Sequence, residues 1–573
     1  MAEAPPDDDA TAEAAAVGAP GVPARWAWAI LAVVAVAFLA VGLVQAGRDA
    51  PTVDEGVDVS SGVSYLVRHD LRMNPEHPVL PKAIAALPAL LAHPIVPETR
   101  AWEQGNWFDW SDDFIAANAR AGRLDDILLY ARAVVLLEAV ACAALLYVLA
   151  KRFFGTTGGV LVALAWLVTP YVVGLGHFAM MDLPFGLVTL AFCVLLARWG
   201  DDPTLGRVAA LGGVVGLGLA SRHTMIVLAG FAAVVVAHRL RRTPRDAAVQ
   251  VGVLALVSVG VLWAVYLVLA PGGTAGSIQG SFEGLISQEG SASLPVRIIG
   301  NLPLPLAWRA GFAYLDLTST ARPSSLLGLS WSGGRWWYFP MSALLKVPLL
   351  TSAVVVAGWV VAARRPGGRR ALLTYVALPA LLLWLFLVAQ PLNLGLRLAM
   401  PVVALAFVGI GALARQRAGV GVVLGVSLLA LLVSAPHSLA WTQRPFTPAY
   451  RWVSDSNLDA GQALYEVRRW AEGHDRPYVA LDTTRGMEVG GGSRSMRDVD
   501  PEDVRGWVAV GVTPLMQTRV RELAWLRKYC PVDTIGGGSV LVYRFTTEPD
   551  SSPGPERPVG PCFGARRSTV RSG

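Results

Sequence analysis

Cysteine, lysine and charge of either sign are all scarce in this sequence. The 573 residues include four cysteines, and none of them stands in a spacing typical of zinc or redox sites. Charged residues make up 16% of the chain, whereas apolar residues make up 54%. A chain with so little charge and so much apolar surface is expected to lie largely in lipid. The composition therefore predicts a polytopic α-helical membrane protein.

Long apolar runs support this class. The first begins at Trp26 and continues for about 20 residues, which is enough to cross the hydrocarbon core of a bilayer. It lacks a small-residue cleavage site, so a transmembrane helix is expected instead of a signal peptide. Further runs lie at 127–150, 157–176, 183–199, 206–221, 224–238, 247–270, 341–363, 371–390, 398–414 and 418–438. Together they predict about eleven transmembrane helices.

Basic residues fall in every second connection between these runs. They are Arg25, Lys151, Arg152, Arg198, Arg207 and the clusters at 238–245, 364–370 and 415–417. Because Lys and Arg are retained on the cytoplasmic side of short loops, we expect a multi-pass plasma-membrane protein with a cytoplasmic N-terminus. The net charge of +6 arises largely from these arginines, so nucleic-acid binding is not expected.

The transmembrane part is predicted to span 25–440. Two of its external connections, at about 47–126 and 271–340, are far longer than topology requires, and long ordered loops usually carry function. Residues 1–24 and 549–573 are rich in proline, alanine, serine and charged residues, so both ends are expected to be disordered.

A small extracytoplasmic α/β domain is predicted for 441–548, where strand-like apolar runs alternate with helical patterns such as 518–529. Cys530 and Cys562 lie in or just beyond this exported region and are candidates for a disulfide. Cys142 and Cys193 lie in apolar runs, where we expect small buried side chains.

The stretch PTVDEGVDVSSGVSYLVRHDLRMNPEHPVLPK at 51–82 carries charge beside the first apolar run. Thr52 and Glu55 have the spacing of a helix capping box, which is one explanation for Glu55. Asp54 has no such role, and a carboxylate at a crowded membrane edge must be paired or used. Helical spacing predicts an amphipathic helix on the outer leaflet, with a polar stripe of Asp54, Asp58, Ser61 and Tyr65.

A resemblance to a known family rests on motifs spread along the chain. They are DE at 54–55, EHPVLPK at 76–82, GHFAMMDLP at 176–184, GGRWWYFPMSALLKVPL at 333–349, NLGLRLAMP at 393–401 and DSNLDAGQALYEVRRW at 455–470. In this order, over about 50–480, they resemble the bacterial lipid-carrier-dependent glycosyltransferases of the GT-C superfamily, in the protein O-mannosyltransferase and aminoarabinose-transferase-like branch. The chain departs from most relatives at Ala460, where they have tryptophan, and at Arg222, where lysine is frequent; both departures leave the substrate open.

The resemblance implies transfer of a sugar from a polyprenyl phosphate to an extracytoplasmic hydroxyl group. Asp54 matches the acidic residue expected to take the proton from the acceptor hydroxyl. The lipid-phosphate leaving group needs positive charge, which Lys82, Arg222 and Arg397 can supply. A single displacement with one carboxylate predicts inversion at the anomeric carbon.

The remaining candidates have weaker signals. Asp182 matches an acidic residue that could orient the acceptor or Asp54, and it could equally cap a helix. Tyr338 and Lys346 match an aromatic and basic motif for donor binding, and interface lysines often extend to lipid headgroups instead. His77 could donate a hydrogen bond to the substrate. Glu55 stays a catalytic candidate beside its capping role.

Several alternatives remain open from the sequence. No cofactor is required, although Asp54, Glu55 and Asp182 could hold a divalent ion as oxygen ligands. The acceptor could be a protein, a glycan or a glycolipid. Candidate external residues at span ends favour an enzyme over a transporter or flippase of lipid-linked sugars, whose sites lie near the bilayer midplane. A catalytically inactive scaffold relative is the third class.

Overall fold

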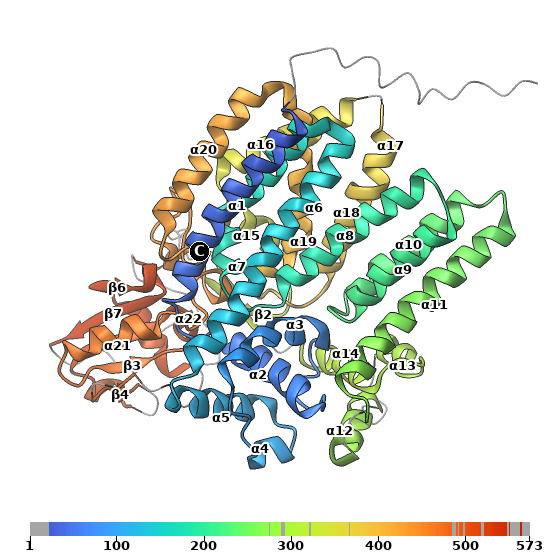
Figure 1. Cartoon of the computed structure of the whole chain (residues 1–573). Helices are drawn as coiled ribbons and strands as arrows, with labels where there is room; N and C mark the ends of the chain where they lie inside the picture. The colour runs from blue at the N-terminus through green and yellow to red at the C-terminus, as the bar shows by residue number, and fades with distance from the viewer. Residues whose placement is uncertain are drawn as a thin grey trace, which may run out of the picture.

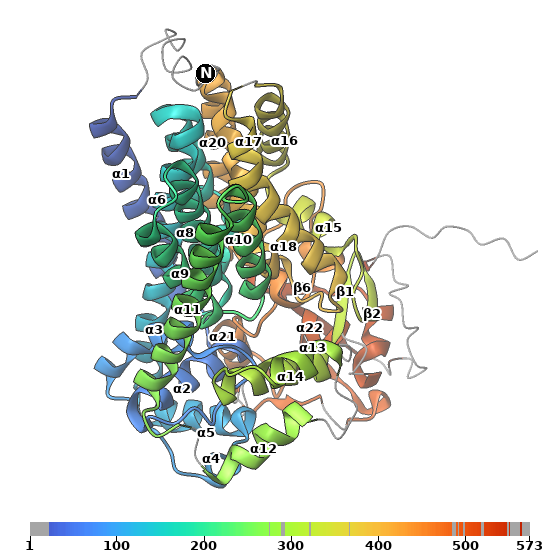
Figure 2. The same cartoon turned by 90° about the vertical axis from the view of Figure 1, so that its right-hand side faces the viewer.

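A computed structural model describes 22–273, 276–287, 293–319, 322–365, 367–483, 487, 489–490, 492–496, 499–516, 521–546, 549 and 562–563. The predictions of disorder for 1–24 and 549–573 concern residues that lie almost wholly outside these ranges. The described chain forms an upright helix bundle, a layer of shorter helices below it and a small sheet at one lower side (Figure 1). Figure 2 shows the same three parts from the side.

Six helices or helical stretches within the described residues are long and apolar enough to cross a membrane. They are α1 (Ala24–Ala46), α6 (Leu124–Leu167), α8 (Asp182–Asp201), α11 (Pro244–Leu269), the stretch Arg369–Ala389 and the stretch Leu396–Ser434. The bent pair α15 (Tyr338–Lys346) and α16 (Leu349–Arg364), with an angle of 118° between the two helices, raises the number to 7 if it is one span. The predicted class of polytopic helical membrane protein is confirmed.

The apolar runs, which predict about eleven transmembrane helices, correspond to fewer continuous helices in the structure. Helix α6 with the short α7 (Pro170–Gly176) covers two of them, and a kink at Gly155, whose φ is 73°, separates the two halves. The Leu396–Ser434 stretch covers two more, in α19 (Met400–Phe407), the 3-10 helix η6 (Val408–Gln416) and α20 (Arg417–Ser434). The Arg369–Ala389 stretch contains α17 (Arg369–Leu372), the π-helix η4 (Leu373–Ala377) and α18 (Leu378–Ala389).

Two apolar helices that match predicted runs fall short of the length needed for a straight span. They are α9 (Leu205–Leu219) and α10 (Met225–Arg239), which match the predicted runs within 206–238. Both pack beside α11 at the edge of the bundle (Figures 1 and 2).

The two long connections fold into the lower layer. The first forms α2 (Val53–Arg68), α3 (Val79–Ala89), η1 (Leu90–Ala92), α4 (Arg100–Glu103) and α5 (Trp107–Arg120). The second forms α12 (Gly276–Ser287), α13 (Leu294–Gly300), α14 (Leu306–Thr318) and the hairpin of β1 (Pro323–Leu326) and β2 (Leu329–Ser332). Helix α2 does not expose the polar stripe that its amphipathic pattern suggested, because residues 55–65 are all buried and the helix packs on α3 and α5.

The C-terminal part contains the predicted small α/β fold. Its five-stranded sheet has the order β4-β3-β5-β7-β6, formed by β3 (Tyr478–Ala480), β4 (Arg494–Ser495), β5 (Gly506–Gly511), β6 (Asp533–Ile535) and β7 (Val540–Phe545). Strands β4, β3 and β5 are parallel, whereas β5, β7 and β6 are antiparallel. Helices α21 (Leu464–Glu472) and α22 (Val512–Met516) accompany the sheet, and Cys530 and Cys562 form the anticipated disulfide.

The remaining short elements are 3-10 helices within the bundle, between the bundle and the sheet, and among the strands. They are the 3-10 helices η5 (Leu396–Ala399), η7 (Ala449–Arg451), η8 (Asp455–Asn457), η9 (Pro501–Asp503), η10 (Arg521–Lys528) and η11 (Gly536–Gly538). Element η10 occupies most of the helix predicted at 518–529, whose first residues lie outside the described ranges. The backbone of Ala50 donates a hydrogen bond of 3.0 Å to Gln462 O, so the C-terminal part is joined directly to the end of α1.

Candidate functional site

A polar cavity of about 620 Å³ lies where the lower layer, the bundle and the C-terminal part meet. Its acidic lining residues are Asp54, Asp58, Glu76, Asp182, Asp455, Asp459 and Asp482. Its basic lining residues are Arg222, Arg322 and Arg397, joined by His77 and Asn74. These side chains come from segments far apart in sequence, and the cavity is the natural candidate for a binding site.

Arg397 is the central cation of the cavity. Its Nη1 donates to Asp54 Oδ2, and its Nε lies 3.8 Å from Asp182 Oδ2. Arg222 donates to the other oxygen of Asp182. The Asp54 side chain is 44% exposed while that of Arg397 is 14% exposed, so Asp54 is the accessible member of the pair. Two arginines and two carboxylates therefore lie at one place, as the motifs suggested.

Local structure explains how these residues meet. Asp54 stands in the first turn of α2, Asp182 is the first residue of α8, and Arg397 lies in η5 directly before α19. Gly395, with φ of 84°, turns the chain just before η5, a conformation that favours glycine. Each residue thus sits at the end of a helix, where the backbone changes direction and the side chain can face a cavity.

Glu55 has a different position from Asp54. It does not line the cavity and is fully buried, and it completes the predicted capping box: Thr52 N donates to Glu55 Oε2 at 3.0 Å and Glu55 N donates to Thr52 Oγ1 at 3.2 Å. Arg132 Nε and Nη2 each donate to a Glu55 oxygen at 2.7 Å, and Ala179 N donates at 2.8 Å. Burial alone would raise the pKa of Glu55, but these partners hold it below its usual value.

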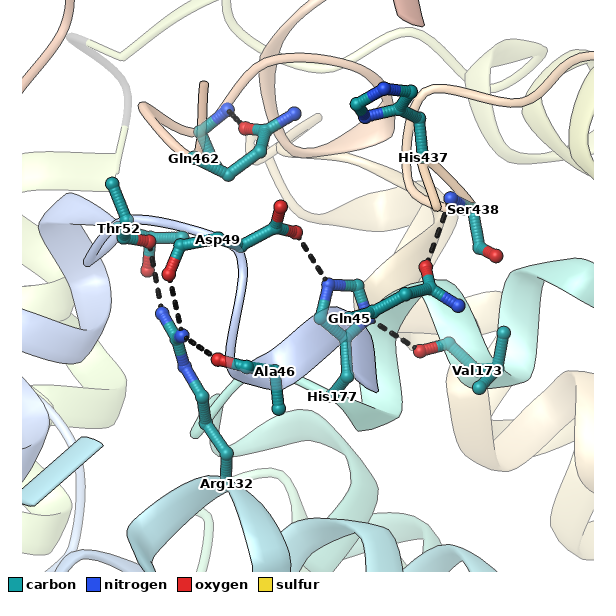
Figure 3. Close-up of polar contacts among 12 residues, drawn as sticks. Gln45, Ala46, Asp49, Thr52, Arg132, Val173, His177, His437, Ser438 and Gln462 are labelled. Atoms are coloured by element: carbon teal, nitrogen blue, oxygen red, sulfur yellow. Dashed lines mark hydrogen bonds and ion pairs between the residues drawn. The ribbon is translucent and has the colours of Figure 1, made fainter. Parts of the chain in front are cut away.

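Arg132 also holds the connection between α1 and α2, as Figure 3 shows in part. Its guanidinium donates to the carbonyls of Ala46 at 2.6 Å, Asp49 at 2.7 Å and Ala50 at 2.9 Å. One buried arginine therefore fixes both the end of the first span and the start of α2. Because Asp54 is the neighbour of Glu55, this cluster sets the position of Asp54.

A buried histidine extends the same connection. His177 Nδ1 lies 2.7 Å from Val173 O, which can only accept, and His177 Nε2 lies 2.8 Å from Asp49 Oδ2 (Figure 3). The ring therefore joins α7 to the connection between α1 and α2. Ser438 N donates to Gln45 Oε1 at 3.1 Å, which ties the end of α1 to the segment after α20.

Lys82 is fully buried in α3 and does not line the cavity. Its Nζ donates to Asn74 O at 2.6 Å and lies 5.5 Å from the centre of the Tyr65 ring. Lys82 therefore lies behind the cavity wall, where it holds the backbone of Asn74. Asp58, one helical turn after Asp54, does line it, and burial raises the pKa of Asp58, with Lys82 opposing and the Asp54 and Glu76 charges adding to the shift.

His77 lines the cavity beside two cations. Burial and the charges of Arg222, Lys82 and Arg322 lower its pKa well below the usual value, so the ring is neutral near pH 7. Its Nε2 lies 4.0 Å from Glu76 Oε1, and the same Glu76 oxygen accepts from Arg322. A neutral imidazole next to arginines can exchange hydrogen bonds with a substrate without adding charge.

Tyr338 and Lys346 are buried behind the cavity wall. Tyr338 Oη accepts from Gly395 N at 2.7 Å and from Asn457 Nδ2 at 3.3 Å. Lys346 Nζ donates to three backbone carbonyls, those of Leu439 at 2.5 Å, Trp441 at 2.5 Å and Asn457 at 2.8 Å. In this geometry both residues hold the turns that carry Arg397 and the start of the C-terminal part.

Sequence reasoning did not assign a substrate role to several lining residues. Asp58 had a usable signal, because it lies four residues after Asp54 on the same face of α2. Asp455, Asp459 and Ala460 belong to a quoted motif, but their place in the wall depends on how the C-terminal part docks. Arg322 had no distinguishing local pattern.

A second cavity of about 590 Å³ adjoins the first and is mostly apolar. Its apolar lining includes Phe185, Ile226, Ile298, Phe312, Leu383, Phe386, Leu387 and Val402, from α8, α10, α13, α14, α18 and α19. The two cavities share His77, Arg222, Leu315, Leu392 and Leu398. An amphiphilic ligand would thus find an apolar region and a charged region joined at Arg222. Within the described ranges, no three His, Cys, Asp or Glu side chains group as metal ligands.

Comparisons with known proteins bear on this arrangement. Residues 126–264 match the model of a family described as dolichyl-phosphate-mannose-protein mannosyltransferase. This range contains Asp182 and Arg222, and the match confirms the resemblance to GT-C glycosyltransferases. The spans indicate a multi-pass membrane protein, and its residues 126–264 are similar to this glycosyltransferase family. No curated protein matches the chain by sequence.

Among solved structures, the chain is similar to ArnT from Cupriavidus metallidurans bound to undecaprenyl phosphate. The two are 14% identical, the alignment covers 91% of this chain and 98% of that one, and the TM-score is 0.31. It is also similar to the oligosaccharyltransferase of Archaeoglobus fulgidus, with 12% identity, 85% and 69% coverage and a TM-score of 0.40.

Proposed function

We propose that this protein transfers a sugar from a polyprenyl-phosphate donor to a hydroxyl group, with inversion at the anomeric carbon. The observation that carries the proposal is the joining of two cavities of opposite polarity at Arg222 and His77. A lipid-linked sugar has the same order of parts: an apolar chain, a phosphate and a polar sugar. The isoprenoid chain would lie in the apolar cavity and the sugar in the polar one.

The phosphate is assigned to Arg222 and Arg397. Both guanidiniums line the polar cavity, and planar guanidinium groups match phosphate oxygens well. In the transfer, the bond between the anomeric carbon and the phosphate oxygen breaks, and its electron pair leaves with the phosphate. The two arginines stabilise the charge that develops there, so the leaving group needs no proton. Any hydroxyl that reaches the opposite face of the sugar can thus serve as the acceptor.

Asp54 acts as the general base in this proposal. The hydroxyl oxygen attacks the anomeric carbon, and its proton passes to the Asp54 carboxylate. In the free protein Asp54 is paired with Arg397, so its carboxylate is engaged by that guanidinium. A bound phosphate competes for the same guanidinium and thereby frees Asp54 when the donor is in place. Asp182, held by Arg222 and Arg397, positions these cations.

The accompanying topology is also a proposal. The cytoplasmic N-terminus and the extracytoplasmic C-terminal domain at 441–548 follow from the distribution of Lys and Arg between the loops. In this orientation the polar cavity opens on the extracytoplasmic side, and the transmembrane domain at 25–440 with its two external loops builds most of its wall. The reaction as written uses no metal ion or other cofactor.

Transfer assays with purified protein in detergent test the proposal. Radiolabelled polyprenyl-phosphate-mannose and polyprenyl-phosphate-arabinose serve as donors, and native membrane extract supplies acceptors. We expect transfer from one donor by the wild type, and a loss of about 100-fold or more in Asp54→Asn, as for removal of a general base. Asp246→Asn, an exposed carboxylate in the first turn of α11, is the matched control and should keep full activity.

Two results would contradict the proposal. Full activity of Asp54→Asn would show that Asp54 is not the general base, and it would leave the proposed class of glycosyltransferase unaffected. Absence of transfer from both donors, by folded protein that binds the lipid, would favour a transporter or a scaffold.

A further inference from the structure

Asn74 is an unusual member of the polar cavity wall. It is 3% exposed, its φ is 46°, and its side-chain Oδ1 makes no hydrogen bond within the part of the chain that the structure describes. A buried acceptor without a donor is costly, and it needs a physical reason. A non-glycine residue in the left-handed region adds backbone strain of the kind that collects at functional sites.

The surrounding residues hold Asn74 firmly in this conformation. Its backbone carbonyl accepts from Lys82 Nζ at 2.6 Å and from Tyr65 Oη at 3.3 Å. Its side-chain Nδ2 donates to Asp58 Oδ1 at 2.9 Å. This hydrogen bond directs the amide nitrogen toward Asp58. The Oδ1 atom is then the amide atom turned away from Asp58, and it has no donor among the described residues.

Asp58 supplies a second acceptor at the same place. It is 5% exposed and lines the cavity with Asn74. Among the described residues, its carboxylate has only the hydrogen bond from Asn74, which leaves its second oxygen available. Asn74 Oδ1 and the second Asp58 oxygen are adjacent acceptors to which no described residue donates, and they fit hydroxyl groups, because a hydroxyl can donate to either atom. They do not fit the phosphodiester of a lipid-linked sugar, whose oxygens only accept.

We propose that Asn74 and Asp58 form a recognition site for sugar hydroxyl groups and so determine which sugar the cavity accepts. This inference rests on the proposed transfer reaction, since it places a sugar in the polar cavity. The hydroxyls could belong to the donor sugar or to a glycan acceptor, and the chemistry of recognition is the same for both. A hydroxyl that donates to Asn74 Oδ1 satisfies the atom that the free protein leaves without a partner.

Equilibrium binding separates this inference from catalysis. Polyprenyl-phosphate-mannose and polyprenyl-phosphate-arabinose are compared with bare polyprenyl phosphate, using purified full-length protein in detergent. We expect the wild type to bind one of the sugar-bearing lipids about 10-fold or more tightly than the bare phosphate, as one satisfied buried acceptor allows. Asn74→Gly should lose this preference and keep its affinity for bare polyprenyl phosphate.

The choice of variants follows from the backbone. Glycine tolerates a φ of 46° better than alanine does, so Asn74→Gly removes the side chain without adding strain. Asp58→Asn is the second variant: it keeps the shape of the side chain, removes the charge and should also reduce the preference. Asn301→Ala is the matched control, because Asn301 is exposed and lies at the end of α13 outside the cavity.

An acceptor arm distinguishes the two sources of hydroxyls. Methyl α-mannoside is offered as a soluble acceptor, and its KM is compared between the wild type and Asn74→Gly. A raised KM with an unchanged donor preference assigns the site to the acceptor, and a lost donor preference assigns it to the donor sugar. If neither quantity changes in Asn74→Gly and Asp58→Asn, the inference is wrong, whether or not transfer occurs. Equal loss of affinity for bare polyprenyl phosphate would also overturn it, because the variants would then act on the whole cavity.

Discussion

The pairing of Arg132 with Glu55 allows a test of what the second acidic residue of the DE motif does. Replacing Arg132 by methionine puts an unbranched apolar side chain in place of the charged one. The Glu55 carboxylate is then buried without its cation. Breaking a buried ion pair from one side costs about 3–5 kcal/mol, because the remaining charge is uncompensated. The three carbonyls of Ala46, Asp49 and Ala50 lose their donor as well. We therefore expect Arg132→Met to lower the free energy of unfolding by at least about 3 kcal/mol.

Denaturant titration in detergent, followed by intrinsic fluorescence, measures this loss. A double-mutant cycle is formed by the wild type, the single variants Arg132→Met and Glu55→Met, and their double variant. Because each side chain bonds the other at 2.7 Å, the cost of the double variant should fall short of the sum of the single costs by about 1–3 kcal/mol. Additive costs, or a neutral Arg132→Met, would refute the reasoning.

Transfer activity of Glu55→Gln addresses the catalytic hypothesis directly. Since Glu55 lies outside the polar cavity, a Gln variant that remains folded should retain most of its kcat, with any loss following the loss of stability. Complete loss of transfer in fully folded Glu55→Gln would instead support Glu55 as a catalytic group, as the sequence alone had allowed.

Three further predictions concern stability. Lys346→Met should lower the free energy of unfolding by about 2 kcal/mol or more, because three carbonyls lose their donor; an unchanged denaturation midpoint would contradict this. Reduction of the Cys530–Cys562 disulfide, which closes a separation of 32 residues, should cost about 4 kcal/mol in denaturant titrations with and without dithiothreitol, and equal midpoints would rule out a stabilising role. Burial raises the pKa of Asp459 from 3.8 to about 7, so this carboxyl stabilises the fold below its unfolded pKa, and the contribution, up to about 4 kcal/mol, is lost as pH rises through about 7. Asp459→Asn should flatten the pH dependence of stability between pH 4 and pH 7, and an unchanged profile would show that another group titrates.

The class of the protein and much of its local structure could be predicted from the sequence. Apolar runs report directly on lipid exposure, so the spans were predictable, and the kink at Gly155 in α6 falls between the predicted runs 127–150 and 157–176. The capping box at Thr52 and Glu55 was correctly predicted because both partners lie within one helical turn. The polar stripe of α2 is buried instead of facing water, since such a stripe can line a buried cavity as well.

It was harder to predict from the sequence which candidate residues face the cavity and which lie behind its wall. Asp54, Asp182 and Arg397 meet at the cavity as their motifs suggested, each at the end of a helix, and Arg222 joins them from the turn between α9 and α10. Lys82, Tyr338 and Lys346 have the same kind of local signal and yet lie behind the wall, bonded to backbone carbonyls or amides. A motif marks a residue as unusual, but whether it faces the cavity depends on the rotation of its helix against its neighbours.

Sequence by itself determined the membrane class, the two long functional connections and the charged helix ends, because hydrophobicity, chain length and capping act over short distances. Only the tertiary structure decided that Arg132 from α6 neutralises Glu55, that Asp455 and Asp459 close one side of the cavity, and that Asn74 keeps an unsatisfied oxygen. These depend on contacts between segments up to hundreds of residues apart, such as Asp54 with Arg397. No local pattern encodes such contacts, since they arise only when the whole bundle and its lower layer pack together.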